Sequence, residues 1–351
     1  MQEYRNILVH CLVNIGDVIL STSAVALLRQ AYPAARITMM VRQDVAGLLQ
    51  NHPVIDEVLV FDYKNKQRSI LAQLRFFGEL KKRQFDLVIS FDRKLRPALL
   101  TWLAGIPTRV APEKVFDDKP SQVTKFYTDI IPIKYDLTTH LQADTYQEIV
   151  RKFCGINGVA APVLGAISNA SAERARNLVA RLPKDQLKVA LCVKGTFALK
   201  NWPLERFAQL VDRINAKFAP AFFVVGAPQD GAFAAALAKL VSVEVANFCG
   251  ETTLPELLAL FKQSDLFITV DTGAAHIAAT TGIPMVVMYG CTSPRRWAPI
   301  NPQAVAISKE PGCLPCNKGE TECDMRDCLQ QVTVDEVFEA ALTYFNLPQA
   351  R

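Results

Sequence analysis

Short apolar runs alternate with amphipathic stretches along the 351-residue chain. In its first part, apolar runs rich in β-branched residues predict strands, and apolar residues spaced three or four positions apart predict helices. The predicted strands are 6–13, 37–41, 58–61, 85–91 and 108–111, and the predicted helices are 18–31, 44–49, 70–83, 97–103 and 140–154. Strands and helices that alternate in this way indicate a doubly wound parallel sheet.

The same alternation returns after residues 162–182, which we interpret as a hinge and entry segment. The predicted strands of this part are 189–193, 221–225, 243–247, 266–270 and 285–289, and its predicted helices are 205–218, 230–240, 254–262 and 274–281. We therefore expect an α/β protein with two Rossmann-like domains, residues 1–160 and 161–332, and a C-terminal segment, residues 333–351. The cleft between two such domains is the natural place for a ligand.

Residues 266–290 combine a strand, a sharp turn, a helix and a second strand, which together form a βαβ unit. The first strand ends at Asp271, Thr272 and Gly273, and His276 follows one helical turn later. Ligands of parallel sheets bind at the carboxyl ends of strands, and the N-terminus of a helix favours anions. These residues therefore predict a diphosphate site, although an ordinary helix N-cap at Asp271 or Thr272 would also explain the turn.

Asp17 follows the first predicted strand, with Gly16 before it, and so lies on the ligand-bearing edge of the first sheet. A carboxylate there can act as a general base that takes a proton from a sugar hydroxyl. The alternative is an acid that caps the helix or interacts with its macrodipole. The loop lacks the G-x-G-x-x-G spacing of dinucleotide-binding proteins, which argues against a nicotinamide-dependent enzyme.

Basic residues follow two further strands of the first domain, on the same edge as the predicted base. They are Lys64, Arg68, Arg93 and Arg96. Arginine and lysine at such an edge can hold a phosphorylated acceptor, and the alternative is ordinary solvated surface charge.

Lys200 lies in the loop after the strand at 189–193, next to Trp202 and Pro203, which we expect to stiffen that loop. A lysine with a defined direction at this edge would neutralise a departing diphosphate, and the hydroxyl of Thr196 would lie nearby. The alternative for Lys200 is again a solvated loop residue.

The chain is 50% hydrophobic and 21% charged, with a formal net charge of +5, as in ordinary globular proteins. This balance carries no nucleic-acid signature. The N-terminal residues lack the features of a signal peptide, and no window approaches about 18 uninterrupted apolar residues. We therefore expect a cytoplasmic chain without a transmembrane helix.

The nine cysteines fall into two groups. Five are scattered in apolar or turn contexts, where we expect reduced structural thiols: Cys11, Cys154, Cys192, Cys249 and Cys291. The others cluster near the C-terminus, at Cys313, Cys316, Cys323 and Cys328. Four thiols this close can hold a structural metal, but only one C-x-x-C pair is present, so free thiols are the simpler interpretation.

Four motifs together resemble glycosyltransferase family 9, the heptosyltransferases of the lipopolysaccharide core. They are NIGDVILST at 14–22, KNWP at 200–203, VDTGAAHIAA at 270–279 and the loop TSPRRWAP at 292–299. Within that family the chain is most similar to the heptosyltransferase III type. The resemblance implies a GT-B fold, in which a C-terminal helix crosses back to the first domain, and residues 334–345 fit that helix.

The resemblance also implies an inverting transfer of heptose from ADP-heptose to a sugar of the lipopolysaccharide inner core. It implies that no cofactor or catalytic metal is needed. The enzyme would work at the cytoplasmic face of the inner membrane and contact that membrane only peripherally.

By the motifs, Asp17 matches the general base, and Lys200 matches the lysine on the donor phosphates. Contacts with the donor are implied for Thr196, Lys200, Thr252, Asp271, Thr272, Gly273 and His276. The alternatives are a protein O-heptosyltransferase, a GT-B-like sugar-nucleotide epimerase and a non-catalytic sensor of ADP-sugars.

Overall fold

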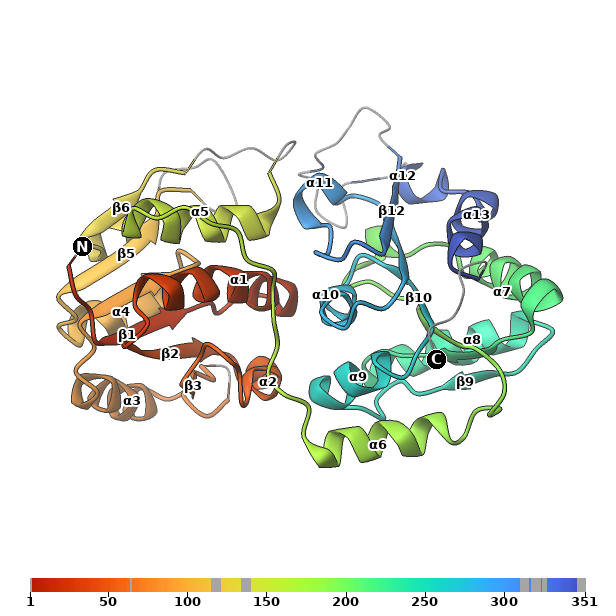
Figure 1. The fold of residues 1–351 in the computed structure, drawn as a ribbon, viewed down its shortest axis with the longest axis horizontal. Coiled ribbons are helices and arrows are strands. Elements are labelled where there is room, and N and C mark those ends of the chain that lie inside the picture. Colours follow the sequence, from red (N-terminus) through yellow and green to blue (C-terminus); the bar gives the residue numbers. More distant parts are fainter. Residues whose placement is uncertain are drawn as a thin grey trace. The chain divides into compact units, whose positions relative to one another are not determined.

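The chain folds into two compact units, which Figure 1 shows with their helices and strands. The computed structural model describes residues 2–63, 65–114, 121–133, 140–309, 316, 323 and 327–345. Unit 1 comprises Met1–Asp136 with His140–Ala166, and unit 2 comprises Leu137–Thr139 with Ile167–Arg351. Each unit contains one six-stranded sheet in which every neighbouring pair of strands is parallel, as the sequence predicted.

The sheet of unit 1 has the strand order β3-β2-β1-β4-β5-β6. Its strands are β1 (Asn6–His10), β2 (Arg36–Val41), β3 (Glu57–Val60), β4 (Leu87–Ser90), β5 (Thr108–Pro112) and β6 (Asp129–Ile131). Its helices are α1 (Ile15–Ala31), α2 (Gln43–Ala46), α3 (Ile70–Lys82), α4 (Leu95–Leu103) and α5 (Gln142–Cys154), with short 3₁₀ turns η1 (Gly47–Leu49) and η2 (Gln122–Phe126). Successive strands are added on one side of β1 up to β3 and on its other side from β4 onward, so the strand order changes direction between β1 and β4. Ligands of such sheets bind at that point.

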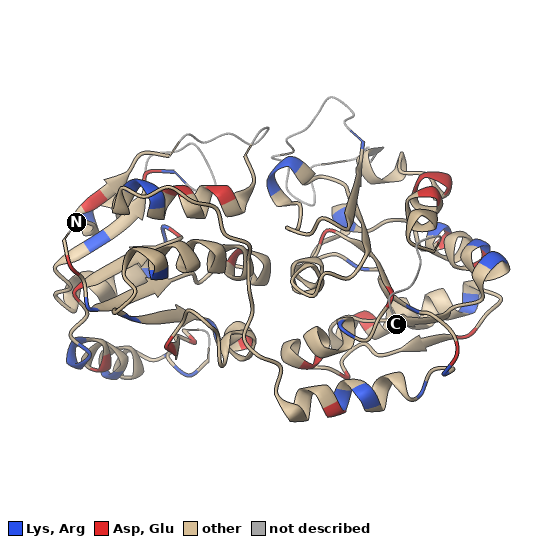
Figure 2. Cartoon of the chain, viewed as in Figure 1, with Lys and Arg blue, Asp and Glu red and all other residues tan. Residues whose placement is uncertain are grey.

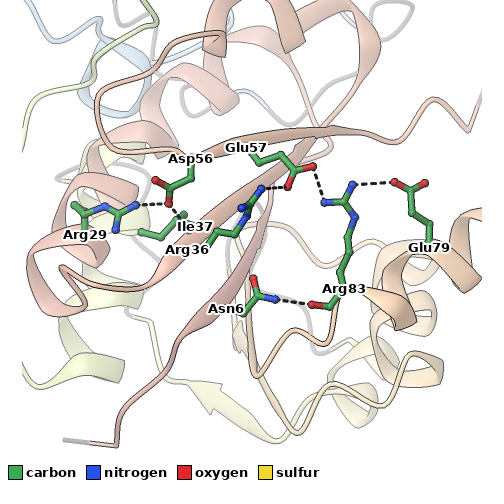
Figure 3. Close-up of polar contacts among 8 residues, drawn as sticks. All are labelled: Asn6, Arg29, Arg36, Ile37, Asp56, Glu57, Glu79 and Arg83. Atoms are coloured by element: carbon green, nitrogen blue, oxygen red, sulfur yellow. Dashed lines mark hydrogen bonds and ion pairs between the residues drawn. The ribbon is translucent and has the colours of Figure 1, made fainter.

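Ion pairs and hydrogen bonds join the amino ends of the strands in unit 1 (Figure 3). Arg83 bonds Glu57 at 2.6 Å and Glu79 at 2.9 Å, and Arg36 bonds Glu57 at 3.0 Å. The side-chain amide of Asn6 donates to the carbonyl of Arg83 at 2.5 Å. These contacts stabilise the amino-terminal edge of the sheet, whereas Asp17 and the basic loop residues were predicted at the carboxyl-terminal edge.

Unit 2 repeats the same order, β12-β11-β10-β7-β8-β9, when its strands are counted from β7. Its strands are β7 (Lys188–Cys192), β8 (Ala221–Val224), β9 (Val245–Asn247), β10 (Leu266–Val270), β11 (Met285–Tyr289) and β12 (Ala304–Ser308). Its helices are α6 (Asn169–Val179), α7 (Leu204–Phe218), α8 (Gly231–Leu240), α9 (Leu254–Phe261), α10 (Gly273–Ala279), α11 (Pro294–Trp297), α12 (Asp327–Gln330) and α13 (Val334–Phe345), with 3₁₀ turns η3 (Ala198–Lys200) and η4 (Pro228–Asp230). Here the reversal lies between β7 and β10.

Five of the described helices and strands were not predicted: β6, α6, α11, α12 and β12. Only one residue of β6 is buried and β12 is at most half-buried throughout, so neither carries the apolar run by which a strand is recognised. Helix α6 lies inside the predicted hinge. It buries only Ser171, Ala175 and Leu178, so its apolar stripe is narrow.

Unit 1 ends at Ala166 and not at the predicted residue 160, because the intervening segment is bonded to it. The amide of Gly165 donates to the carbonyl of Leu48 at 2.8 Å, and the ring of His52 bonds the carbonyl of Val163 at 2.9 Å. A Cβ on Gly165 would lie 1.9 Å from the carbonyl oxygen of Gln50, so only glycine fits there.

The C-terminal helix α13 belongs to unit 2 by its contacts. Val337, Phe338 and Ala341 join the core of that unit, and the ring of Phe345 stacks on Phe218 of α7 at 4.2 Å. A crossing of this helix to the first domain, as the resemblance implied, stays a prediction.

Candidate active site

Asp17 lies in the first turn of α1, just past the carboxyl end of β1. Its side chain is buried, and the hydroxyl of Tyr146, on α5, donates a hydrogen bond to its Oδ1 at 2.8 Å. Burial and the charge of Asp17 raise the pKa of Tyr146 well above its usual value, so the phenol stays protonated and acts as a donor. The N-cap of α1 is Asn14, so the interpretation of Asp17 as the cap is wrong.

Asp92 follows β4 and braces the loop in which β1 ends. It accepts hydrogen bonds from the amides of Leu12 at 2.8 Å and Lys94 at 3.0 Å, and the ammonium of Lys94 donates to the carbonyl of Leu12 at 2.6 Å. Burial alone would raise the pKa of Asp92, but His10 and the two amides hold it below its usual value. The carboxylate of Asp92 thus joins the loop after β1 to the loop after β4. No motif in the sequence marks this residue.

Arg68 lies on the loop after β3 and Arg93 on the loop after β4, whereas Arg96 lies in the first turn of α4. Lys64 falls outside the described residues. Arg68 is exposed, and Arg96 lies over the ring of Tyr63 at 5.2 Å. Arg93 donates to the carbonyl of Glu113 at 2.7 Å. Their positions at this edge agree with the prediction, and their role in acceptor binding stays a prediction.

In unit 2 the structure brings Lys200 and Asp271 together at the strand reversal. The ammonium of Lys200 lies 2.6 Å from Oδ2 of Asp271, with both side chains mostly buried (14% and 7% exposed). The hydroxyl of Thr292 donates to the same carboxylate oxygen at 2.7 Å. Lys200 comes from the loop after β7 and Asp271 from the end of β10, which are neighbouring strands.

The loop that carries Lys200 is held in place from two sides. A Cβ on Gly195 would lie 2.4 Å from the Cβ of Lys200, and a Cβ on Gly290 would lie 2.7 Å from the carbonyl oxygen of Leu199. The amide of Gly195 donates to Asn201 at 2.8 Å. The buried indole of Trp202 donates to the carbonyl of Val332 at 3.0 Å, which confirms that Trp202 stiffens the loop.

Two buried polar atoms next to this ion pair have no hydrogen-bond partner among the described residues: Oγ1 of Thr272 and Nδ1 of His276. Thr272 is the N-cap of α10, yet its side chain makes no capping hydrogen bond. Burial lowers the pKa of His276 to about 4, so its ring is neutral near pH 7. Buried polar groups are normally paired, which makes these two atoms candidates for contact with a ligand. The thiol of Cys192 interacts with the Thr272 side chain.

The weaker predicted donor contacts lie at the surface of unit 2. Thr196 is exposed and Thr252 is half-buried. The turn before Thr252 is held by Glu251, whose carboxylate pairs with Arg181 at 2.6 Å and Arg174 at 3.3 Å. A role of Thr196 and Thr252 in nucleotide binding stays a prediction.

The sequence profile of glycosyltransferase family 9 (heptosyltransferase) matches residues 73–325. The chain belongs to this family. The match covers most of the chain, including the Lys200 loop and the turn at Asp271–Gly273, and it confirms the predicted resemblance.

Known members of family 9 are similar to this transferase over most of their length. Lipopolysaccharide heptosyltransferase 3 of Escherichia coli is 23% identical over 299 residues, which are 81% of this chain and 83% of that one. The structure of a family 9 glycosyl transferase from Veillonella parvula has a TM-score of 0.85 at 23% identity and covers 98% of both chains. Heptosyltransferase WaaC of E. coli, solved with ADP, has a TM-score of 0.72 at 19% identity, covering 97% and 99%. These likenesses confirm the GT-B fold.

The cysteine cluster of this family 9 transferase lies partly outside the described residues, which exclude Cys313. No group of three or more His, Cys, Asp or Glu suited to a metal occurs in the described part of the chain. Burial raises the pKa of Cys291 to about 12, and Cys316 and Cys328 add to this rise. Cys291 is a buried free thiol, as predicted, and so are Cys11, Cys154 and Cys192, whereas the free thiol of Cys249 is half-buried.

None of the helices in the described ranges combines the length and the hydropathy that a bilayer-spanning helix requires.

Proposed function

We propose that this transferase moves heptose from ADP-heptose to a sugar of the lipopolysaccharide inner core, with inversion at the anomeric carbon. The observation that carries the proposal is the position of Lys200, 2.6 Å from Asp271 and beside the unpaired Thr272 and His276. The names of the similar proteins support it: E. coli lipopolysaccharide heptosyltransferase 3 and a WaaC structure with ADP.

On the donor side, Lys200 supplies the positive charge that a departing diphosphate needs. The ion pair with Asp271 keeps the ammonium at the carboxyl end of the sheet, and the close contacts of Gly195 and Gly290 hold its loop in place. A preorganised charge costs no reorganisation when negative charge develops on the leaving group. The hydroxyl of Thr272 and the backbone of Gly273 would bind the phosphate oxygens.

On the acceptor side, Asp17 acts as the general base. It takes the proton from the acceptor hydroxyl while that oxygen attacks the anomeric carbon and the bond to the β-phosphate oxygen breaks, so that ADP leaves. One such displacement inverts the configuration. Tyr146 is a positioning residue, because its hydrogen bond of 2.8 Å fixes the direction of the carboxylate.

We propose that the transfer needs no cofactor or metal, since Lys200 already provides a cation for the diphosphate. An assay with and without a chelator tests this point: equal turnover is expected, and a loss that added metal restores would contradict it.

The substrate is tested by incubating the full chain with ADP-heptose and measuring ADP release with a core oligosaccharide, with a protein acceptor and with neither. Release that depends on the core oligosaccharide is expected. Release that depends on the protein would make the chain a protein O-heptosyltransferase, and altered donor without ADP release would make it an epimerase.

A further inference from the structure

Large apolar side chains are exposed on two neighbouring helices of unit 1. Eleven large hydrophobic side chains are exposed in the described part of the chain, and seven of them belong to α3 and α4. Those on α3 are Ile70 (77% exposed), Leu71 (69%) and Leu74 (57%), and those on α4 are Leu95 (55%), Leu99 (36%), Trp102 (47%) and Leu103 (49%). Such a concentration marks an interaction site, whereas single exposed apolar residues do not.

The two helices present these residues on the same side of unit 1. Phe76 and Leu80 of α3 and Leu100 of α4 are buried in one cluster with Met40 and Val88 of the sheet. The exposed residues lie on the opposite sides of both helices, with the spacing of one helical stripe on each. We call the exposed sides of Ile70–Lys82 and Leu95–Leu103 the α3/α4 face.

The charges on the α3/α4 face are almost all positive. Arg75, Lys81 and Lys82 are exposed on α3, and Arg96 is exposed on α4. Figure 2 shows the Lys and Arg segments of α3 at the lower left. Within these two helices Glu79 is the single acid, and it is paired with Arg83 at 2.9 Å (Figure 3).

We propose that the α3/α4 face docks onto the surface of a bilayer that contains anionic lipids. Apolar residues in a stripe, flanked by Lys and Arg, are the features of helices that lie in the membrane interface. Trp102 on that stripe suits the headgroup region, where tryptophan is enriched. A second copy of the chain fits less well, because like charges would face each other across the contact.

The side chains that the experiment changes take no part in the proposed transfer, and Arg96, a predicted acceptor contact, is left as it is, so the two proposals can fail separately. The experiment is co-sedimentation of the full chain with vesicles of phosphatidylethanolamine and phosphatidylglycerol, and with vesicles of phosphatidylcholine alone. Leu71→Gln/Leu74→Gln/Leu99→Gln removes apolar contact, and Leu240→Gln on α8, 48% exposed, is the matched control. Circular dichroism verifies folding, which exposed substitutions should leave intact.

We expect binding to the anionic vesicles, with a loss of at least about tenfold in the triple leucine variant and no change in Leu240→Gln. Arg75→Gln/Lys81→Gln/Lys82→Gln should weaken binding by on the order of 100-fold, about fivefold per charge. Lys239→Gln, an exposed lysine on α8, is the control for charge. Absence of binding by the wild type, or equal binding by the triple leucine variant, would overturn the proposal. So would a dimer that the leucine substitutions abolish while vesicle binding is unaffected.

Discussion

Replacing Lys200 with methionine should weaken ADP binding by about 10- to 100-fold. Methionine keeps most of the apolar stem that packs against Gly195 and removes only the ammonium. A hydrogen bond to a charged partner contributes roughly 1.5–3 kcal/mol, and each 1.4 kcal/mol corresponds to about a tenfold change in affinity. The Lys200 side chain is 14% exposed, so solvent screens this contribution only in part.

The partner of Lys200 adds a second part to this prediction. Once the ammonium is gone, Asp271 presents an unpaired carboxylate to the diphosphate, and this repulsion adds to the loss. Lys200→Met/Asp271→Asn should therefore bind ADP more tightly than Lys200→Met alone, with a coupling of roughly 0.5–3 kcal/mol between the two positions.

The assay is isothermal titration calorimetry of the full chain with ADP. The control is Lys194→Met, because Lys194 lies in the same loop after β7 and pairs with Asp230 at 3.2 Å. Its affinity should stay within about twofold of the wild type, as expected for an ion pair that is not in the site. A folded Lys200→Met protein that binds ADP as well as this control would refute the assignment of Lys200 to the donor site.

Three further predictions concern the surroundings of the two sites. Tyr146→Phe should lower kcat by on the order of tenfold without changing ADP affinity, because the base loses its positioning hydrogen bond. The control is Tyr4→Phe, which loses a hydrogen bond of 3.2 Å to Thr108 and should leave kcat unchanged. Gly195→Ala should weaken ADP binding in calorimetry, since its Cβ would displace the loop by contact at 2.4 Å. Because the folded-state pKa of His276 is lowered from 6.5 to about 4, stability should fall as pH falls through that interval, by at most about 1.4 kcal/mol per pH unit. Urea unfolding of His276→Gln should show a shallower dependence on pH.

Ten of the twelve strands in the described ranges, with the residues that follow them, could be predicted from the sequence. An alternating βα pattern places Asp17, Lys200 and Asp271 at carboxyl edges, whatever the order of the strands. The contact between Lys200 and Asp271 also requires β7 to pair with β10. The order of the strands along the chain does not predict that pairing.

Other parts of the site depend on contacts that leave no local signal. Tyr146 is 129 residues from Asp17 and reaches it only because α5 packs against α1. Helical spacing predicted α3 correctly, but Ile70, Leu71 and Leu74 look the same in the sequence whether they are buried or exposed. The approach of Cys328 to Gly290 likewise follows from tertiary packing: a Cβ on that glycine would lie 3.6 Å from the Sγ of Cys328.

The proposed chemistry requires Asp17 to accept the proton of the attacking hydroxyl. The measurement that tests it most directly is ADP release from ADP-heptose by Asp17→Asn, with a core acceptor present. Asparagine keeps an oxygen for the hydroxyl of Tyr146 but is not a base, so turnover should fall by on the order of 10²–10⁴-fold while ADP affinity stays unchanged. Turnover within a few-fold of the wild type would contradict the account.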